Sequence, residues 1–447
     1  MQETFEPFGA LTVGVLPGCE PRLLREVGEV EDLGAYRGAG GYAPLGDVET
    51  LSSEVRHSGL LGRGGAAFPI AVKLSTVREA HRRGRETVVV ANGEEGEPAS
   101  VKDKWLLRRR PHLVLDGLRL AAAIVGARRA YVYVSDPESA RRVDAALTEL
   151  DAAGSTGLTV ELDTAGSTGL TVELVTVAAG YVAGEETAAV RAIDGGPAKP
   201  SDKPPRPFEQ GVGGLPTVVS NVETLAHLPY VHRHGGAAFR AVGTDASPGT
   251  FLATITGGDR PAALYELPHG TPFTELLALH GIPADAVRGA LTGGYFAGMV
   301  DRTILDATLD HASMRGLGGG LGCGAFSLIT RECPVAVAAG VLSYFDRENA
   351  GQCGSCFNGT AAMAAAALAL RDGQAATADI DRLRRWSVVL RGRGACGTLD
   401  GAANAAATLL ARFPDAVAAH LSGGCATCAR GIHVAERPFD AQAVTVS

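Results

Sequence analysis

Three cysteines in the last third of the chain have a spacing typical of metal ligands. Cys353 and Cys356 lie three positions apart, between a helical pattern and an alanine-rich one, and Cys396 follows two helical patterns later. Soft thiolate ligands select iron–sulfur clusters or zinc over hard cations. The residues alone leave a second interpretation open, because free cysteines also pack as small apolar residues inside helical bundles.

The other cysteines divide into a second pair and three isolated residues. Cys425 and Cys428 repeat the same spacing near the C-terminus. This pair is expected either to fold back and supply a further ligand to the first three cysteines or to bind a metal separately; the alternative is two redox-inactive thiols in a tail. The isolated residues Cys19, Cys323 and Cys333 are assigned to packing. Because five of the 8 cysteines follow residue 350, the pattern indicates metal or redox chemistry in a reducing compartment rather than a disulfide framework.

A glycine-rich loop at residues 59–68 is the first candidate ligand site along the chain. Four glycines, Arg63 and Phe68 precede a predicted helix that carries Lys73 one turn in. Backbone amides at the start of a helix bind phosphate, an aromatic ring stacks on a flat ring system, and a lysine reaches a phosphate or a reduced flavin. Taken alone, the loop also fits a flexible turn.

Carboxylates gather where a predicted buried strand ends. Residues 87–91 form a continuous apolar and β-branched run, which is typical of a strand inside a parallel sheet. Asn92, Glu94, Glu95 and Glu97 follow at once. Ligands of open α/β sheets bind beyond the carboxyl ends of the strands, where carboxylates hold ribose hydroxyls and repel an extra phosphate. An exposed acidic turn is the alternative for this segment by itself.

A second acidic segment follows at residues 180–187. Glu185 and Glu186 open a predicted helix, whose N-terminus favours negative charge, so one of them has a capping role as its alternative. Between the two acidic segments, residues 153–162 recur as 165–174. Two copies with a period of twelve are too few for a solenoid, and we expect a longer surface loop or an added strand-like flap.

Composition limits the classes of function. The 447 residues have 46% hydrophobic residues and a net charge of −8, which argues for sizeable cores and against a nucleic-acid surface. The first six residues carry acids where a signal peptide needs basic residues, and the longest apolar run, 334–345, is shorter than the ~20 residues of a membrane span. We therefore expect a soluble, cytoplasmic protein with no direct membrane insertion, in some settings peripheral to a membrane complex.

Six segments, in this order along the chain, resemble the NADH-binding flavoprotein subunit of respiratory complex I. Soluble NAD-linked hydrogenases and formate dehydrogenases have similar subunits. The resemblance extends from about residue 40 to about residue 420, and six motifs in register are far more specific than any one of them. The segments are 62–73, 92–98, 184–187, 203–205, 221–224 and 353–356.

The resemblance implies a set of cofactors and contacts. It implies that NADH gives a hydride to FMN and that a [4Fe-4S] cluster takes the electrons singly, so that no catalytic acid is required and the protein's role is placement and electrostatic tuning. The implied FMN contacts are Gly62, Arg63, Gly64, Lys73, Asn92, Glu94, Tyr181, Gly184, Glu185, Glu186 and Asn221. The implied contacts of the nicotinamide nucleotide are Phe68, Glu97, Glu186 and Lys203. The cluster ligands are Cys353, Cys356 and Cys396.

Two departures from the family pattern leave alternatives open. Thr76 and Arg206 stand where the family has further aromatic rings around the adenine, each stacked pair being worth about 1 kcal/mol. Arg206 can instead stack or meet a phosphate, so NADH, NADPH and no nucleotide all remain open. Ala350 replaces the first cysteine of the family's cluster motif. A [3Fe-4S] cluster, a [4Fe-4S] cluster with a non-cysteine ligand, and no cluster each agree with three thiols.

The expected fold class is an α/β flavin- and nucleotide-binding domain, then a small β-grasp domain of the soluble-ligand-binding type, then an all-α four-helix iron–sulfur domain. The expected boundaries are residues 1–245, 246–332 and 333–420, followed by a tail at 421–447. In the first domain, residues 1–55 are expected to be irregular except for a helix from Val48 to about Ser58. The bundle is expected to consist of helices at 335–347, 360–371, 379–391 and 402–412.

The favoured function is an NAD(P)H dehydrogenase-type flavoprotein that passes electrons through FMN and an iron–sulfur cluster to a protein partner, either a ferredoxin or a small subunit like that of complex I. The alternative is a non-catalytic relay or assembly subunit that keeps the fold and no longer oxidises NADH. A third possibility, a binding module built around the β-grasp piece, gives the thiols and acids no role.

Overall fold

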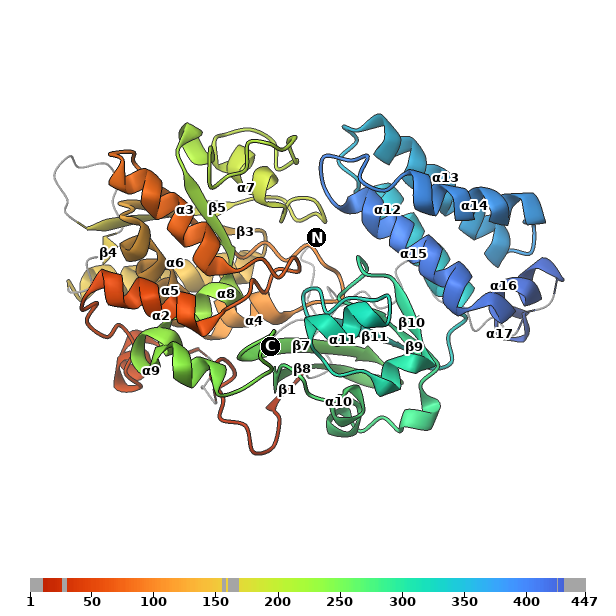
Figure 1. Ribbon diagram of the computed structural model, residues 1–447, viewed down its shortest axis with the longest axis horizontal. Helices are drawn as coiled ribbons and strands as arrows, with labels where there is room; N and C mark the ends of the chain where they lie inside the picture. Colours follow the sequence, from red (N-terminus) through yellow and green to blue (C-terminus); the bar gives the residue numbers. More distant parts are fainter. Residues whose placement is uncertain (1–10, 26–29, 155–157, 160–168, 424, 430–447) are drawn as a thin grey trace, which may run out of the picture.

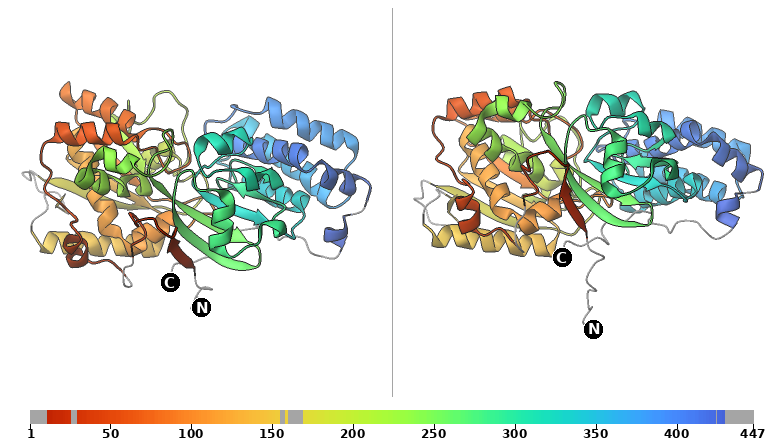
Figure 2. Two further views of the ribbon diagram at one scale, coloured as in Figure 1. Left: turned by 60° about the horizontal axis from the view of Figure 1, so that its bottom comes forward. Right: turned by 90° about the horizontal axis from the view of Figure 1, so that it is seen from below.

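The computed structural model describes residues 11–25, 30–154, 158–159, 169–423 and 425–429. It contains two sheets and a helical bundle (Figure 1). The five-stranded sheet lies at one end of the molecule, the bundle at the other, and the six-stranded sheet lies between them, an arrangement that Figure 2 also shows from below. The mixed α/β architecture agrees with the fold class expected from the sequence.

The five-stranded sheet is wholly parallel and has the order β4-β5-β3-β2-β6. Strand β2, which lies between β3 and β6, is buried on both faces, as its run of three valines and an alanine requires. The expected strand at 87–91 is confirmed within one residue. The strand bounds are β2 Val88–Asn92, β3 Arg129–Val134, β4 Leu158–Thr159, β5 Leu170–Thr176 and β6 Thr217–Asn221.

Helix α5 is the centre of the packing against this sheet. Fourteen of its 15 residues are buried, and it contacts β2, α3, α8 and α9. The expected helix at Val48–Ser58 is confirmed as α2. The helices of this part are α1 Leu33–Gly38, α2 Val48–Ser58, α3 Ile70–Arg82, α4 Lys102–Arg109, α5 Pro111–Val125, α6 Pro137–Ala152, α7 Glu186–Ile193, α8 Val222–Ala226 and α9 Leu228–Arg240.

The two copies of the twelve-residue repeat meet at the edge of this sheet. Strand β4 comes from the first copy and β5 from the second, and Leu158 pairs with Leu170 and Thr159 with Thr171, which are equivalent positions in the two copies. The expectation of an added strand is confirmed for these residues, whereas 155–157 and 160–168 lie outside the described residues. The duplication therefore extends the sheet at the edge opposite β6.

The six-stranded sheet has the order β1-β8-β7-β11-β9-β10 and mixes parallel and antiparallel pairs. Its first strand, β1, comes from Thr12–Val15, inside the segment expected to be irregular. That expectation is wrong here, because a short edge strand can form by pairing with β8. It is also wrong at α1, whose N-terminus is capped by Asp32. The bounds are β1 Thr12–Val15, β7 Thr250–Gly257, β8 Arg260–Pro268, β9 Gly289–Thr292, β10 Met299–Asp301 and β11 Ala325–Ile329, with α10 Phe273–His280 and α11 His311–Gly316.

The C-terminal bundle is built around α12, whose residues from Pro334 to Phe345 are all buried. Helix α12 packs on α13 and α15, and α14 packs on α15. The four expected helices are confirmed, with starts two to six residues earlier for α13, α14 and α15. The bounds are α12 Pro334–Glu348, α13 Gly354–Arg371, α14 Thr377–Val389, α15 Thr398–Arg412, α16 Pro414–Leu421 and α17 Ala426–Ala429. Among the described residues, no helix has the length and apolar character needed to cross a membrane.

Candidate flavin and iron–sulfur site

Two adjoining cavities open at the carboxyl edge of the five-stranded sheet. Strands β2 and β6 end side by side there, because Asn92 pairs with Asn221. One cavity of about 390 Å³ reaches the acidic loop after β2, and the other, of about 470 Å³, reaches α3. The residues that border both are Gly64, Ala66, Asn92, Gly184, Glu185 and Asn221. The shared rim makes one elongated site at the place where open α/β sheets bind ligands.

The glycine-rich loop closes onto this edge with almost no space for side chains. The amide of Gly62 donates to the carbonyl of Phe68 at 3.0 Å, so the loop folds back on itself before α3 begins. A Cβ on Gly64 would lie 3.1 Å from Cβ of Asn221, and Gly65 has a φ of 115°. Only glycine fits a backbone that approaches β6 this closely and turns this way.

Glu94 points a buried carboxylate oxygen into the site without a partner. Ser135 donates to its Oε1 at 3.3 Å, whereas Oε2 has no hydrogen-bond partner in the described part of the chain. Burial raises the pKa of Glu94 to about 7. Gly184 leaves room for this oxygen, since a Cβ there would lie 2.5 Å from it. An orphaned buried acceptor beside a glycine cradle fits a ligand with an N–H or O–H donor, as the imide edge of a flavin has.

The cavities gather ten of the eleven residues for which the resemblance implies FMN contact. Arg63 is the exception. Its guanidinium is buried and donates to the carbonyls of Pro248 at 3.1 Å and Thr250 at 3.0 Å, on the side of the six-stranded sheet. The side chain of Arg63 therefore joins the glycine loop to β7 instead of lining either cavity. The ten that line one or both cavities are Gly62, Gly64, Lys73, Asn92, Glu94, Tyr181, Gly184, Glu185, Glu186 and Asn221.

Lys102 is a site residue that the sequence analysis missed. It lines the first cavity with 1% of its surface exposed, and its ammonium lies 2.7 Å from Asp103 and 3.0 Å from Glu223. Burial by itself lowers the pKa of Lys102, but the two carboxylates raise it, so the lysine keeps its proton. Asn221 connects this network to the cavity rim, because it accepts from Lys102 at 3.2 Å and donates to Asp103 at 2.6 Å. The sequence feature that could have identified Lys102 is a lysine directly before an acid, Asp103, at the start of a helix.

Charges of both signs line the second cavity. Glu185 caps α7 by accepting from the amides of Thr187 and Ala188, so the capping role left open above is confirmed for this residue. Glu185 also pairs with Lys203 at 2.5 Å, and Glu186 pairs with Lys73 at 3.1 Å. Because the lysines and glutamates are only partly buried and neutralise one another, they can exchange partners when a charged ligand enters.

Phe208 is a second residue that the sequence analysis missed. Its ring lies 6.5 Å from that of Phe68, with only 14° between the two planes, and both rings line the second cavity. Arg206 lies at the same rim, 3.6 Å from Glu186 and 55% exposed. Thr76 lies on α3 and bonds back to the carbonyl of Val72. Phe208 thus supplies an aromatic partner to Phe68 two positions beyond the arginine that replaces the family's ring.

Glu97 and Tyr181 line the first cavity, on the side that faces the bundle. Glu97 accepts from the amide of Tyr295 at 3.1 Å, and a Cβ on Gly294 would lie 2.3 Å from its carboxyl carbon. The ring of Tyr181 packs edge-on against Phe345 of α12 at 5.2 Å, and burial raises the pKa of Tyr181. These contacts join the flavin-side loops to the bundle.

The three predicted cluster ligands converge at the end of the bundle that faces this cavity. Cys353 directly precedes α13, Cys356 lies in its first turn, and both line a small cavity together with Cys396 from the link before α15. Burial, and then the neighbouring Cys396 and Cys353, raise the pKa of the Cys356 thiol to about 12. Ala350 lines the same small cavity, at the position of the missing cysteine. Three thiols around one cavity fit an iron–sulfur cluster with one non-cysteine position.

The second cysteine pair does not reach this cavity. Cys425 and Cys428 lie beside Cys333 and His420 instead, so the expectation that the pair folds back to the first three cysteines is wrong, and the separate-site alternative agrees with the geometry. Cys333, assigned to packing from the sequence, is buried but has its Sγ 3.2 Å from Nε2 of His420. The physical reason is that α12 separates the two groups.

The site defines a flavin- and iron–sulfur-binding class of protein, and comparisons with known proteins agree. Residues 55–230 match the family model of the Nuo51 FMN-binding domain, and residues 336–420 match that of the NADH-ubiquinone oxidoreductase-F iron–sulfur binding region. The chain is 33% identical over 417 residues to the second NADH-quinone oxidoreductase F subunit of Rhizobium meliloti (strain 1021), covering 90% of this chain and 98% of that protein.

Two further relatives extend the comparison. The mitochondrial NADH dehydrogenase [ubiquinone] flavoprotein 1 of Dictyostelium discoideum is 33% identical, over 79% of this chain and 75% of that protein. The crystal structure of an NAD⁺-reducing [NiFe]-hydrogenase in the H₂-reduced state has a chain with a TM-score of 0.75 and 30% identity, which covers 84% of this chain and 63% of that chain. The present chain therefore belongs to the family of NADH-quinone oxidoreductase F subunits.

Proposed function

We propose that this chain oxidises NADH and passes the electrons through FMN and an iron–sulfur cluster to an iron–sulfur protein partner. One observation supports this function more than any other. Cys396 borders both the small cavity of the three thiols and the first cavity at the sheet edge. A flavin in the first cavity would therefore lie next to a cluster ligand, which is the arrangement that two-electron to one-electron transfer needs.

The first cavity has the features that FMN requires. FMN supplies the chemistry of accepting a hydride and releasing its electrons one at a time. Gly64, Gly65 and Ala66 line this cavity with little side chain, so the backbone of the loop is proposed to meet the phosphate, and the unpartnered Oε2 of Glu94 to accept from a ring N–H. Asn221 is held in place by its hydrogen bonds to Lys102 and Asp103, so it forms a fixed part of the rim that the two cavities share. We propose the ten cavity-lining residues named above as FMN contacts, and a loop-positioning role for Arg63, whose amide donates to Thr224 at 2.9 Å.

The nucleotide is proposed to enter through the second cavity. The rings of Phe68 and Phe208 are nearly parallel and both line this cavity, so they offer aromatic faces on which an adenine can stack, the role that the family gives to other rings. Lys203 and Glu186 line this cavity, and we propose that the lysine contacts the phosphates and the glutamate a ribose. Glu97, which lines the first cavity, is proposed as a further contact of the nucleotide. NADH is the proposed donor, because the carboxylates of Glu186 and Glu97 would repel the extra phosphate of NADPH.

The bundle end around the thiols is the proposed contact surface for the electron acceptor. Phe357, directly after Cys356, is 56% exposed, and Val388 is 66% exposed. The end of α14 lies against the start of α13, since a Cβ on Gly359 would lie 2.8 Å from Leu390. Exposed apolar side chains beside a redox centre suit a transient protein partner, either a ferredoxin or a small iron–sulfur subunit of a complex.

This contact surface can be tested by one substitution. Phe357→Ser should slow reduction of a ferredoxin or a partner subunit roughly tenfold while leaving reduction of ferricyanide by NADH unchanged, because the loss of one interface anchor costs about 1 to 2 kcal/mol. The matched control is Val72→Ser on α3, which also removes an exposed apolar side chain but lies away from the thiols. Equal slowing with both acceptors would place Phe357 in the electron path instead of the interface.

The domain boundaries at 245 and 332 are part of this proposal, as is a β-grasp identity for the middle sheet. In this arrangement the middle sheet contacts the glycine-rich loop through the hydrogen bond from Arg63 to the carbonyl of Thr250. Its strand β11 leads through a short link into α12, the first helix of the bundle. The chain would work as a cytoplasmic subunit, in some assemblies peripheral to a membrane complex.

The decisive experiment is spectroscopic. The anaerobically purified and reconstituted protein should show flavin bands over broad iron–sulfur absorbance, and NADH should bleach the flavin more efficiently than NADPH. A protein that binds neither FMN nor iron after reconstitution would contradict the proposal.

The relay or assembly subunit remains the second candidate, because Ala350 and Thr76 depart from the family. It predicts bound flavin that neither NADH nor NADPH bleaches. The Phe68 and Phe208 pair favours the enzyme, since a relay has no use for a nucleotide pocket.

A further inference from the structure

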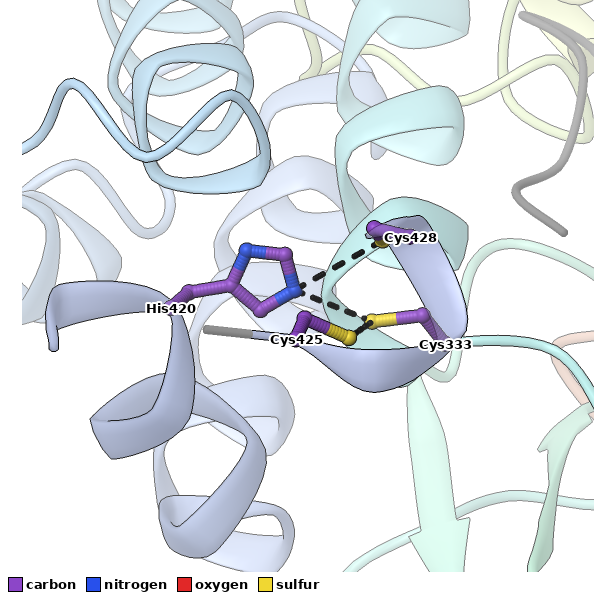
Figure 3. A group of neighbouring side chains, drawn as sticks. All are labelled: Cys333, His420, Cys425 and Cys428. Carbon is purple, nitrogen blue, oxygen red and sulfur yellow. Dashed lines mark hydrogen bonds between the residues drawn. The ribbon is translucent and has the colours of Figure 1, made fainter. Parts of the chain in front are cut away.

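A second group of metal-ligand side chains lies at the opposite end of the bundle from the three proposed cluster ligands. Cys333, His420, Cys425 and Cys428 direct one ligand atom each toward a common point (Figure 3), and these four atoms lie within 4.8 Å of one another. Cys333 and His420 are buried, and the other two are partly buried.

The group is assembled from three separate segments. Cys333 is the residue before α12, in the short link that follows β11. His420 lies in the last turn of α16, and Cys425 and Cys428 come from α17 and the residue before it. A thiol ahead of a short helix and a second in its first turn point to the same side, as in structural zinc sites with a Cys-x-x-Cys motif.

The distances fit one metal ion. Tetrahedral Zn²⁺ with Zn–S bonds of about 2.3 Å places its ligand atoms about 3.3 to 3.8 Å apart. Sγ of Cys333 lies 3.7 Å from Sγ of Cys425 and 3.2 Å from Nε2 of His420, and Sγ of Cys428 lies 3.8 Å from Nε2 of His420. A cubane cluster holds its thiolates about 6 Å apart or more, which is wider than this group.

The group is separate from the site of electron transfer. Cys333 precedes α12 and Cys353 follows it, so the 15 residues of the helix put about 22 Å between the two ends. In Figure 1, α16 and α17 lie at the end of the bundle away from α7 and the flavin site. Three of the four side chains also lie outside residues 336–420, the part that matches the family's iron–sulfur model.

We propose that Cys333, His420, Cys425 and Cys428 bind one Zn²⁺ ion as a closed structural site. Three thiolates and an imidazole form a closed four-ligand set that suits zinc and excludes magnesium or calcium. The ion fastens the segment after α16 to the link between β11 and α12, and so stabilises the junction of the middle sheet with the bundle. No electron passes through it, because Zn²⁺ has no redox chemistry under these conditions.

Metal analysis of the full-length protein tests the site. Protein purified without chelators from cells grown with zinc should contain one zinc per chain in addition to its iron. Cys428→Ser and His420→Ala should each lose the zinc while keeping flavin and iron. The matched control is the double variant Cys353→Ser with Cys356→Ser, which should lose the iron and keep the zinc.

X-ray absorption at the zinc edge of the wild-type protein provides a measurement that needs no folded variant. The expected first shell has three sulfurs and one nitrogen, with no second metal nearby. A shell of oxygen and nitrogen only, zinc that is absent after growth with zinc, loss of iron in Cys428→Ser, or a disulfide joining Cys333 to Cys425 in the isolated protein would each overturn the proposal.

Discussion

The bundle carries two Cys-x-x-Cys pairs, and the comparison between them shows how little the motif itself decides. In each pair the first cysteine precedes a helix and the second lies in its first turn: Cys353 and Cys356 at α13, Cys425 and Cys428 at α17. The first pair meets a third thiol at a cavity that opens toward the flavin site, and the second meets a thiol and an imidazole in one tight group.

The difference comes from what the rest of the fold brings to each pair. At the end of the bundle that faces the flavin site, Cys396 also borders the first cavity, so the thiols have access to a redox partner. At the far end, Cys333 and His420 are buried and complete a set of four ligand atoms. The same local sequence thus suits electron transfer in one place and structural stability in the other.

The largest expected effect comes from a substitution at the end of the bundle that faces the flavin site, here called the flavin end. Cys353→Ser removes one of three thiolates, so iron and acid-labile sulfide should fall to background and reduction of a protein acceptor should stop. Flavin binding and its bleaching by NADH should persist, because Cys353 lines neither cavity at the sheet edge. Iron analysis and stopped-flow spectra measure the outcome. Unchanged iron would remove Cys353 from the ligand set.

A second prediction concerns buried charge, which the flavin end concentrates at Glu94. Burial raises its pKa from 4.5 to about 7, so Glu94 adds stability below pH 4.5 that is lost as the pH rises through 7. The flavin-free wild type should lose about 3 kcal/mol relative to Glu94→Gln over this window. Urea unfolding of both proteins from pH 4.5 to pH 8 measures the difference. Parallel pH profiles would show that Glu94 does not titrate there.

Most of the fold could be predicted from the sequence because its elements are long and strongly patterned. The buried valine run of β2 predicts a strand and the long apolar run of α12 predicts a helix, and both were expected within one or two residues. Strand β1 could not be predicted, since a strand of four residues exists only through its pairing with β8.

The site was predictable where backbone chemistry dictates residue type and missed where tertiary contact decides. Glycines at positions 64 and 184 indicate places where the backbone lies too close to a neighbouring residue for a side chain to fit. Phe208 became visible only when the chain placed its ring opposite Phe68, and Cys333 only when α16 and α17 brought three ligands to it. Separations of 140 and 87 residues leave no local signal for such pairs.

A smaller effect sharpens the role of the flavin end in nucleotide binding. Phe208→Ala removes one ring of the proposed adenine site and should raise the KM for NADH about fivefold, since a stacked pair contributes about 1 kcal/mol. The value of kcat should stay the same because the hydride site is unaffected. Reduced nicotinamide mononucleotide, which lacks the adenosine, should react equally well with both proteins. A fivefold effect on both donors would place Phe208 near the nicotinamide instead.

The last prediction concerns a variant that would give the cluster site a complete set of four protein ligands, as Cys333, His420, Cys425 and Cys428 form at the other end of the bundle. Ala350 lines the cavity of the three thiols, so Ala350→Cys adds a fourth thiolate where the bound cluster has a non-cysteine position. The iron–sulfur absorbance should then decay several-fold more slowly in air, because every iron has a protein thiolate. Ala350→Ser is the matched control: it has the same shape and a weaker ligand, and it should decay like the wild type. If the cysteine and serine variants decay alike, residue 350 does not face the cluster, and the open coordination position lies elsewhere on the cavity wall.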